Sequence, residues 1–328
     1  MKNDIYRKVK ARRILSFNEV NCDIFIKLSE DKYVAIIRAN SLYDSSIIVK
    51  YMSKGVEYFY VNKDEYIKFS ENYYSNAHLA LYSDCICNQE KIELLNSIHE
   101  LVTEHISNIG IDKSVIEMID KVVSSSIDIV KKDEGLFDLL SSMINAKDYL
   151  VEHSMILVYL SCAIALKMGW SSNLTLKKLA LAGMLHDLEI TNPVLAIIHD
   201  CEKQKIDNII DSEDRDIIHK HTLCTAEKIH CMKNYASDVY KLILEHHENP
   251  EGNGFPGGIS SLEISSLSAL LILTEDFVSK IYFSPIGKQK KEDLSELIKY
   301  FKTRYSKGNY QKPLEGLLLY LQSILKEK

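Results

Sequence analysis

Histidine and acidic residues are concentrated in one part of the sequence, where they could bind metal ions. Eight of the eleven histidines lie between residues 153 and 247, at the ends or on the inner faces of stretches whose apolar residues recur at helical spacing. Imidazole and carboxylate groups on separate helices can converge in a bundle core, as metal sites in helical bundles require. The residues that fit this arrangement are His153, His186, Asp187, His221, His246 and His247.

Each of these signals is weak when taken alone. A single histidine on an apolar helix face is most often a core residue whose hydrogen bonds are satisfied, and the dipeptide His-Asp occurs twice, at His186 and at His199. We favour His186 with Asp187, because they follow a long helical stretch rich in small and apolar residues, which suits a buried position. His199, His219 and His230 are then expected on the surface or behind the metal ligands.

The order of the motifs carries more information than any one of them. A histidine is followed by an HD pair, by a further histidine and then by the segment HHENPEGNGFP, which runs from His246 to Pro256. This arrangement resembles the HD-GYP subfamily of the HD phosphohydrolase superfamily, whose members carry HHE-x-x-DG-x-GYP, and the resemblance covers roughly residues 148–287. It implies a metal-dependent phosphodiesterase, with His186 and Asp187 catalytic, that hydrolyses cyclic di-GMP to pGpG and GMP in bacterial second-messenger signalling.

A pair of divalent metal ions is the expected cofactor. Two ions about 4 Å apart, bridged by a carboxylate such as Asp187, can activate water and clamp a phosphodiester for in-line attack. Nitrogen and oxygen ligands without thiolate suit iron or manganese at least as well as zinc, and the resemblance likewise implies iron or manganese. The family's last ligand is an aspartate, for which Glu275 aligns best, with Asp276 next to it. One ion would take His153, His186 and Glu275, and the other His221, His246 and His247.

The segments expected to bind substrate depart from the family pattern. The family writes HDIGK, with a lysine that meets the substrate phosphate, whereas this sequence reads HDLEI, with Glu189 and Ile190 at the last two positions. The tyrosine of GYP is a phenylalanine here, so its hydroxyl hydrogen bond is lost, and the arginines that follow the last ligand in the family are absent. The residues left to contact the substrate are Gly254, Phe255, Pro256 and Lys288.

These departures leave more than one function open. The complete set of five motif histidines supports an active cyclic di-GMP phosphodiesterase. The missing lysine and arginines support instead a catalytically impaired domain that acts as a metal- or nucleotide-binding sensor or as a protein-interaction module. A phosphohydrolase acting on another nucleotide is a third alternative, and a purely structural helical domain would place five histidines by coincidence. The expected partners are cyclic di-GMP or a related nucleotide and a GGDEF-type or other signalling protein, and the sequence is compatible with a homodimer.

The elements that must position these residues are helices. From residue 89 onward apolar residues recur at spacings of three and four, so we expect a mainly α chain whose C-terminal part is an HD-type helical bundle. Short β-rich runs and one helical stretch before residue 87 predict a small α+β domain. The expected organisation is a small α+β regulatory domain over 1–86, linking helices over 87–147 and an HD-GYP helical domain over 148–328.

Tyrosines are dense in the predicted N-terminal domain. They could form a recognition face, but tyrosine-rich strands more often pack a half-buried sheet surface, and we favour packing. No motif there identifies a ligand, so a sensory or dimerising role rests on domain order alone. The tyrosines in question are Tyr51, Tyr58, Tyr60, Tyr66, Tyr73 and Tyr74.

Composition and charge exclude several classes of protein. A length of 328 residues exceeds the usual size of one domain and favours two. A net charge of −6 argues against binding to a nucleic-acid polymer or to an anionic membrane. The seven cysteines are an odd number without a CxxC pair, so neither a disulfide framework nor a thiolate zinc site is indicated. We recognise no secretory leader and no apolar stretch long enough to span a bilayer, so we expect a cytoplasmic protein.

Overall fold

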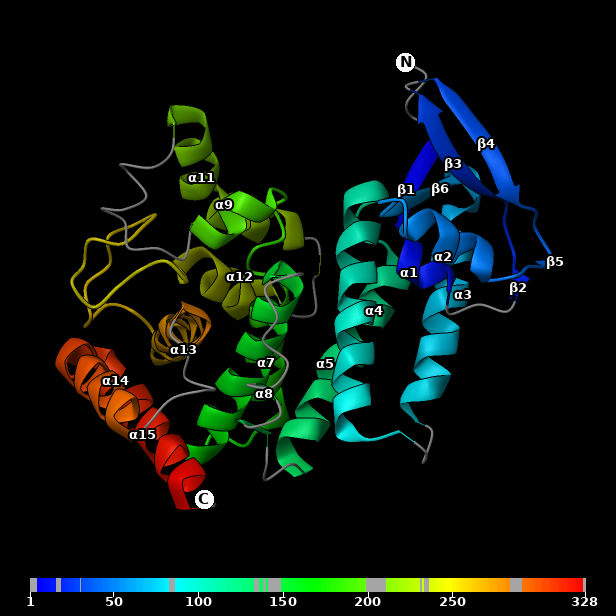
Figure 1. Cartoon of the computed structure of the whole chain (residues 1–328). Coiled ribbons are helices and arrows are strands. Elements are labelled where there is room, and N and C mark those ends of the chain that lie inside the picture. The colour runs from blue at the N-terminus through cyan, green and yellow to red at the C-terminus, as the bar shows by residue number, and fades with distance from the viewer. Residues whose placement is uncertain are drawn as a thin grey trace. The chain divides into compact units, whose positions relative to one another are not determined.

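The structure is a computed structural model in which the chain forms two compact units. It describes the chain apart from residues 1–4, 16–18, 30, 83–85, 133–135, 138–139, 141–148, 199–210, 231, 233–235, 284–290 and 327–328. The N-terminal unit is Met1–Met118 and the C-terminal unit is Ile119–Lys328 (Figure 1). The boundary between them falls inside the stretch 87–147 that the sequence predicts as linking helices.

The N-terminal unit is an antiparallel sheet with accompanying helices. Its strands β1, β6, β3 and β4 lie side by side in that order, and β2 pairs with β5 in a separate two-stranded sheet. The short β-rich runs expected before residue 87 include CDIFIKL, YVAIIRA and EYFYV, which overlap β3, β4 and β6, as expected for an α+β domain. The elements are β1 (Tyr6–Lys10), α1 (Ala11–Ile14), β2 (Glu19–Val20), β3 (Ile24–Ser29), β4 (Lys32–Ile37), β5 (Ser41–Leu42), α2 (Ser46–Met52), β6 (Tyr58–Asn62), α3 (Lys63–Leu81) and α4 (Asn88–Asn108).

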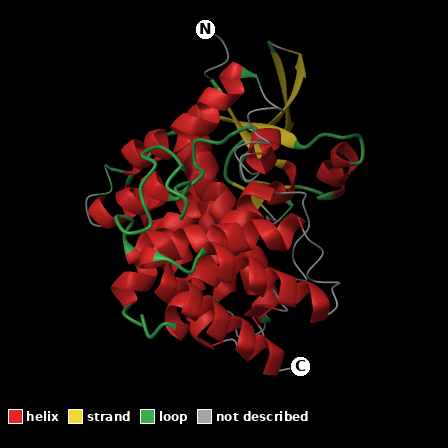
Figure 2. Ribbon diagram, turned by 90° about the vertical axis from the view of Figure 1, so that its left-hand side faces the viewer, coloured by secondary structure: helices red, strands yellow, loops and turns green. Residues whose placement is uncertain are grey.

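The two faces of the four-stranded sheet differ in burial. Side chains on a strand point alternately to opposite faces, and the alternate positions Val9, Ile24, Ile26, Phe59 and Val61 are all buried. Helix α3 packs against β1 and β6, and Figure 2 shows the strands gathered in one part of the chain. Burial of each large aliphatic or aromatic side chain contributes about 1.5–3 kcal/mol, so this buried face stabilises the unit.

The C-terminal unit is built from helices, which confirms the prediction of a mainly α chain with a helical domain. Helix α5 (Lys113–Lys132) crosses the boundary between the units. The helices that follow are α7 (Tyr149–Lys167), α8 (Asn173–Leu185), α9 (Pro193–Ile198), α11 (Ser212–Ile229), α12 (Ala236–Glu245), α13 (Ser266–Phe283), α14 (Lys291–Arg304), the short 3-10 helix η2 (Gly308–Tyr310) and α15 (Gln311–Lys326).

Side-chain caps and a glycine fix where the helices of the site begin and end. The Ser172 hydroxyl accepts the backbone N–H of Thr175 at the start of α8, and the Asp211 carboxylate does the same for the first turn of α11. Helix α7 ends at Lys167 and is followed by Gly169, whose φ of +78° is a left-handed conformation that suits glycine. Two of the helices that carry candidate ligands therefore begin at a capping side chain, and a third is followed by a glycine.

Helix α7 is the central helix of the C-terminal unit. Every residue from 153 to 165 is buried, and α8 approaches so closely that a Cβ on Gly183 would lie 3.3 Å from the backbone nitrogen of Val158. By length and composition α7 could cross a membrane, so the expectation that no apolar stretch is long enough is wrong. However, 78% of that apolar window is buried within the fold, as in the core helix of a globular domain.

Candidate metal centre

The structure brings together all seven residues that the sequence predicts as metal ligands. They lie on, or just beyond the ends of, five helices, α7, α8, α11, α12 and α13. Their ligand atoms form two groups, and within each group these atoms lie within 4.8 Å of one another. All are buried except His247, which is partly exposed. The first group is His153, His186 and Glu275, and the second is Asp187, His221, His246 and His247.

Asp187 connects the two groups. Its Oδ2 lies 3.0 Å from Nε2 of His186 in the first group. Its Oδ1 lies 3.3 Å from Nε2 of His221 and 3.6 Å from Nε2 of His246 in the second. One carboxylate therefore has an oxygen in each group, which is the arrangement of a bridging ligand between two ions.

Glu275, and not its neighbour Asp276, belongs to the cluster. Oε1 of Glu275 lies 2.6 Å from Nε2 of His153, and its Oε2 lies 3.9 Å from Nε2 of His186. The Asp276 carboxylate instead accepts hydrogen bonds of 2.8 Å from the hydroxyls of Tyr300 and Tyr305. The choice that the sequence leaves open is thus decided by the position of the two side chains on α13.

Backbone carbonyls fix the orientation of three of the imidazole rings. Nδ1 of His186 lies 2.9 Å from the carbonyl oxygen of Gly183, and Nδ1 of His221 and of His246 each lie 2.6 Å from the carbonyl three residues earlier. Because a carbonyl only accepts, Nδ1 must carry the hydrogen in each ring, and the Nε2 lone pair points into the cluster. This is the tautomer and orientation of a metal-binding histidine.

The same geometry explains why the cluster suits a cation. Nε2 of His221 and Nε2 of His246 lie 3.2 Å apart, and with hydrogen on both Nδ1 atoms these two nitrogens are both acceptors. Carboxylate oxygens of Asp187 approach the same point. Acceptors gathered in a buried space repel one another unless a cation lies between them. The donor set therefore fits divalent metal ions.

The pKa values of the cluster favour the metal-binding forms of two ligands. Burial lowers the pKa of His246 to about 4. Burial acts to raise the pKa of Glu275, but the neighbouring His153 and His186 outweigh it and the pKa is lowered. Burial also acts to lower the pKa of His186, but Asp187 and Glu275 outweigh it and that pKa is raised. At neutral pH Glu275 is thus charged and His246 neutral, as metal ligation requires.

The glycine-rich segment 251–258 is held against the cluster by Glu248. This buried carboxylate accepts backbone N–H groups from Gly257 at 2.7 Å, Gly258 at 3.1 Å and Ile259 at 2.9 Å. A Cβ on Gly254 would lie 2.5 Å from Cα of Glu248, so only glycine fits where the segment crosses the HHE backbone. We call residues 251–258 the glycine loop.

The glycine loop places Phe255 beside the second ligand group. The Phe255 ring stacks on His247, with centroids 4.7 Å apart and an interplanar angle of 21°, and meets His219 edge-on at 4.6 Å. Of the other predicted substrate contacts, Gly254 and Pro256 flank Phe255 in this loop, whereas Lys288 lies outside the described residues. His219 is half-buried against Phe255, His230 is exposed, and His199 lies outside the described residues.

The two positions that depart from the family's HDIGK pattern have clear structural roles. Glu189 forms an ion pair with Lys228 of α11. Ile190 is only 2% exposed and belongs to an apolar cluster with Tyr149, Leu195, Ala196 and Ile218, against which Phe255 and Tyr282 also pack. The position where the family has its lysine is therefore filled by an apolar side chain.

Sequence reasoning missed two residues that shape the site. Glu248 belongs to the HHE motif, but its role is not predictable from sequence, because its three N–H donors come from a loop whose path the sequence does not reveal. Tyr149 stacks on His153, with centroids 5.2 Å apart and an interplanar angle of 27°. The signal for Tyr149 was its spacing, since a residue four positions before a histidine lies on the same helix face.

Comparisons with known proteins identify the family of this helical domain. The family model for the HD domain matches residues 138–307, which is more than half of the chain. No curated protein sequence matches the chain. Among solved structures, the fold is similar to that of Bd1817, a HDG"Y"P protein from Bdellovibrio bacteriovorus, with a TM-score of 0.63 and 17% sequence identity over 95% of this chain and 99% of that one. The chain belongs to the HD domain family of metal-dependent phosphohydrolases.

Proposed function

We propose that the chain is a two-metal phosphodiesterase whose substrate is cyclic di-GMP, which it hydrolyses to pGpG and GMP. The observation that carries the proposal is the pair of acceptor groups joined by Asp187, with one carboxylate oxygen near each. Two divalent ions in such a site supply Lewis acidity and activate water for attack on a phosphodiester. His153, His186 and Glu275 would hold one ion, and His221, His246 and His247 the other.

Iron or manganese is the proposed metal. The two groups offer only imidazole nitrogens and carboxylate oxygens, and neither group contains a cysteine. Such ligands suit iron and manganese as well as zinc, whereas thiolates would favour zinc or copper. The Nδ1 hydrogen bonds to backbone carbonyls keep the rings aligned before any ion binds.

The protein's own residues would orient the substrate from the side of the glycine loop. Among the proposed ligands, His247 is partly exposed and the others are buried. Phe255, which stacks on His247, is also partly exposed, so a substrate would approach the cluster over these two rings. Partly exposed aromatic rings are suited to stack on a nucleobase. Glu248 would fix the loop on which Phe255 stands. The cyclic di-GMP assignment is supported by the HHENPEGNGFP motif and by the shared fold. A cytoplasmic location, a GGDEF-type partner and a homodimer remain predictions.

One observation favours a second candidate function. Ile190 is buried in an apolar cluster that extends to Phe255, so the described residues place no cation where the family's lysine would meet a phosphate. Loss of one such contact reduces transition-state stabilisation by about 2–4 kcal/mol, or two to three orders of magnitude in rate. The alternative is a catalytically impaired domain that binds metal and nucleotide and acts as a sensor or protein-interaction module.

Turnover of cyclic di-GMP by anaerobically purified protein loaded with iron(II) or manganese(II) separates the two candidates. We expect metal-dependent pGpG or GMP that disappears in His186→Ala and in Asp187→Ala, while the matched control His230→Ala, an exposed histidine outside the cluster, keeps full activity. Folded, metal-loaded protein that yields no product would reject the enzyme in favour of the sensor. A gain of turnover in Ile190→Lys, but not in Ile190→Met, would identify the buried isoleucine as the cause of impairment.

A generic substrate tests the nucleotide specificity separately. Bis(p-nitrophenyl) phosphate contains a phosphodiester but no nucleobase. Hydrolysis of this compound without hydrolysis of cyclic di-GMP would retain the two-metal phosphohydrolase and reject the proposed substrate.

A further inference from the structure

The face of the four-stranded sheet opposite its buried core carries a group of aromatic and basic side chains. Antiparallel pairing places Lys8 and Phe25 opposite Tyr60, and Lys27 opposite Tyr33, so their side chains share one face. Tyr6 and Tyr58 lie two residues from members of this set on the same strands and therefore share that face. We call Tyr6, Lys8, Phe25, Lys27, Tyr33, Tyr58 and Tyr60 the outer face. All seven are partly or fully exposed.

The rings of the outer face lie in contact with one another across the strands. Tyr6 stacks on Tyr33, with centroids 4.1 Å apart and an interplanar angle of 19°. Tyr33 meets Tyr60 edge-on at 5.0 Å, and Tyr6 meets Phe25 edge-on at 5.0 Å. Rings that support each other lose little further conformational freedom when a ligand stacks on them. The outer face is thus a preorganised aromatic surface.

The two lysines give the outer face a positive charge. Nζ of Lys8 lies 5.4 Å from the centroid of the Tyr58 ring, and Nζ of Lys27 lies 5.9 Å from that of Tyr33. No member of the outer face is acidic. The two lysines make these seven residues positive, whereas the whole chain carries a net charge of −6. Each lysine places a cation beside an aromatic ring.

We propose that the outer face binds a free nucleotide, with the base stacked on a tyrosine ring and the phosphate paired with Lys8 or Lys27. Base stacking on exposed aromatic side chains and cations that meet phosphate are the two components of this recognition. The proposal does not depend on the phosphodiesterase activity, and it gives the N-terminal unit the ligand that its predicted sensory role lacks.

The charge of the outer face selects the nucleotide over two other occupants. A nucleic-acid polymer needs many phosphate contacts, and two lysines on a chain of net charge −6 provide few. A second copy of the chain, packed symmetrically on the same face, would bring lysines toward lysines without any carboxylate of that face to pair with them.

Binding of GMP to the full-length His246→Ala protein, measured by isothermal titration calorimetry without added metal, tests the proposal. The His246→Ala background removes a proposed ligand of the metal centre, so a failure of the phosphodiesterase assignment leaves this test intact. We expect GMP to bind, and Tyr33→Ala or Tyr58→Ala to weaken binding about fivefold to a hundredfold. Guanosine, which lacks the phosphate, should bind at least fivefold more weakly than GMP.

Matched variants distinguish the outer face from the rest of the unit. Lys8→Gln combined with Lys27→Gln should weaken GMP binding and reduce its salt dependence, whereas Lys50→Gln on α2 and Tyr82→Ala beyond α3, both exposed, should change the affinity less than twofold. Circular dichroism checks that each variant is folded. Because Tyr33 contacts other rings, Tyr58 and the lysines provide the test if Tyr33→Ala misfolds.

Several results would overturn the proposal. These are no GMP binding at millimolar concentration, equal affinity for GMP and guanosine, and GMP binding that none of the outer-face variants changes. Affinity that rises steadily with the length of a single-stranded oligonucleotide would assign the face to a polymer. A change from dimer to monomer in sedimentation of Tyr58→Ala would assign it to a second copy of the chain.

Discussion

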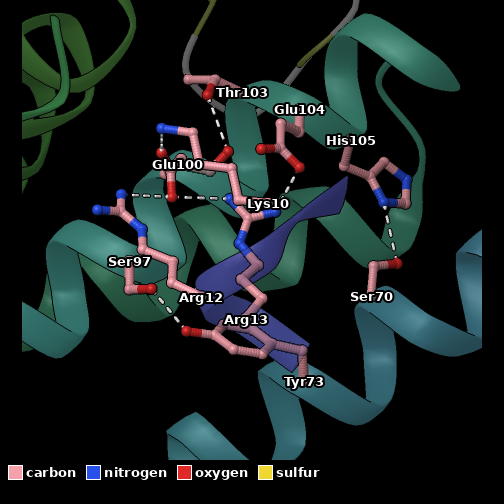
Figure 3. A network of polar contacts seen from close by, with 10 residues as sticks. All are labelled: Lys10, Arg12, Arg13, Ser70, Tyr73, Ser97, Glu100, Thr103, Glu104 and His105. Carbon is pink, nitrogen blue, oxygen red and sulfur yellow. Dashed lines mark hydrogen bonds and ion pairs between the residues drawn. The ribbon is translucent and has the colours of Figure 1, made fainter. Parts of the chain in front are cut away.

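Each unit of the chain contains a cluster of buried ionisable side chains, and the two clusters are constructed in opposite ways. In the N-terminal unit, the fully buried Arg13 lies 3.1 Å from the Glu100 carboxylate and also pairs with Glu104 (Figure 3). Lys10 and Arg12 approach the same Glu100. Every carboxylate in this cluster faces a cation, so the protein itself neutralises the buried charge.

The cluster in the C-terminal unit contains no lysine or arginine. Its members are imidazoles and carboxylates whose acceptor atoms point toward one another, as the 3.2 Å separation of Nε2 of His221 and Nε2 of His246 illustrates. The difference teaches that burial of charge alone does not identify a functional site. A cluster in which donors meet acceptors stabilises the fold, whereas one in which acceptors meet acceptors requires a cation from outside.

The largest expected effect on stability comes from removing the buried cation of the N-terminal cluster. Arg13→Met should lower the free energy of unfolding by about 3–5 kcal/mol, because Glu104 and Glu100 remain in the unit without their buried cation. Urea denaturation followed by circular dichroism measures the change. The control Arg38→Met removes an exposed ion pair with Asp23 and should cost less than about 1 kcal/mol. Equal effects of the two substitutions would contradict the comparison.

The second effect is stabilisation of the acceptor cluster by metal. At about a hundred times its dissociation constant, manganese(II) should stabilise the wild-type protein by about 2.7 kcal/mol. The thermal unfolding midpoint should therefore rise on addition of metal, and this rise should be strongly reduced in His246→Ala but retained in His230→Ala. A rise of the same size in all three proteins would show that the ion binds elsewhere.

Acid should weaken the stabilisation that Glu100 contributes to the N-terminal cluster. Burial acts to raise the pKa of Glu100, but Arg13, Lys10 and Arg12 outweigh it and lower the pKa below its usual 4.5. The stabilisation is therefore complete above pH 4.5 and is lost as the pH falls through the folded-state pKa. We expect the stability difference between wild type and Glu100→Gln to shrink on acidification, measured by urea denaturation between pH 6 and pH 3. A difference that grows would contradict the assigned role of the cations.

The smallest expected effect comes from a substitution in the glycine loop, which packs against the backbone of the metal centre. Gly254→Ala places a Cβ 2.5 Å from Cα of Glu248 and from the carbonyl oxygen of His247, so the backbone must shift. Changes behind metal ligands typically weaken metal binding tenfold to a hundredfold, and we expect about tenfold for manganese(II) in competition titrations. In Gly257→Ala the nearest atom is a side-chain carbon of Ile259 at 3.0 Å, so that control should change affinity less than the first variant.

The sequence predicted the metal centre better than it predicted its surroundings. Histidines and Asp187 on apolar helical stretches indicated six of the seven residues that converge, and the family resemblance supplied the seventh, Glu275. The partners of Asp276 are Tyr300 on α14 and Tyr305 just beyond it, more than twenty residues later, and the roles of Glu248 and Ile190 depend on loop paths. These contacts are tertiary, and no local spacing encodes them.

In the N-terminal unit, too, local pattern predicts the helices and strands but not the tertiary contacts. The short β-rich runs and the helical stretch before residue 87 followed from local pattern, and the structure places β3, β4, β6 and α2 there. The buried cluster joins Arg13 to Glu100 and Glu104 across 87 and 91 positions of sequence, and the run KARR resembles an exposed basic segment. Of the tyrosines for which packing was favoured, Tyr66 and Tyr73 are buried, whereas Tyr58 and Tyr60 lie on the outer face.

The most direct test of the central claim is the metal content of protein purified under anaerobic conditions, measured by inductively coupled plasma mass spectrometry. The two acceptor groups joined by Asp187 predict two equivalents of iron or manganese per chain. They also predict a clear loss in His246→Ala and no loss in His230→Ala. Folded protein that takes up no divalent metal even after incubation with iron(II) or manganese(II), or that keeps its full content in His246→Ala, would contradict the account.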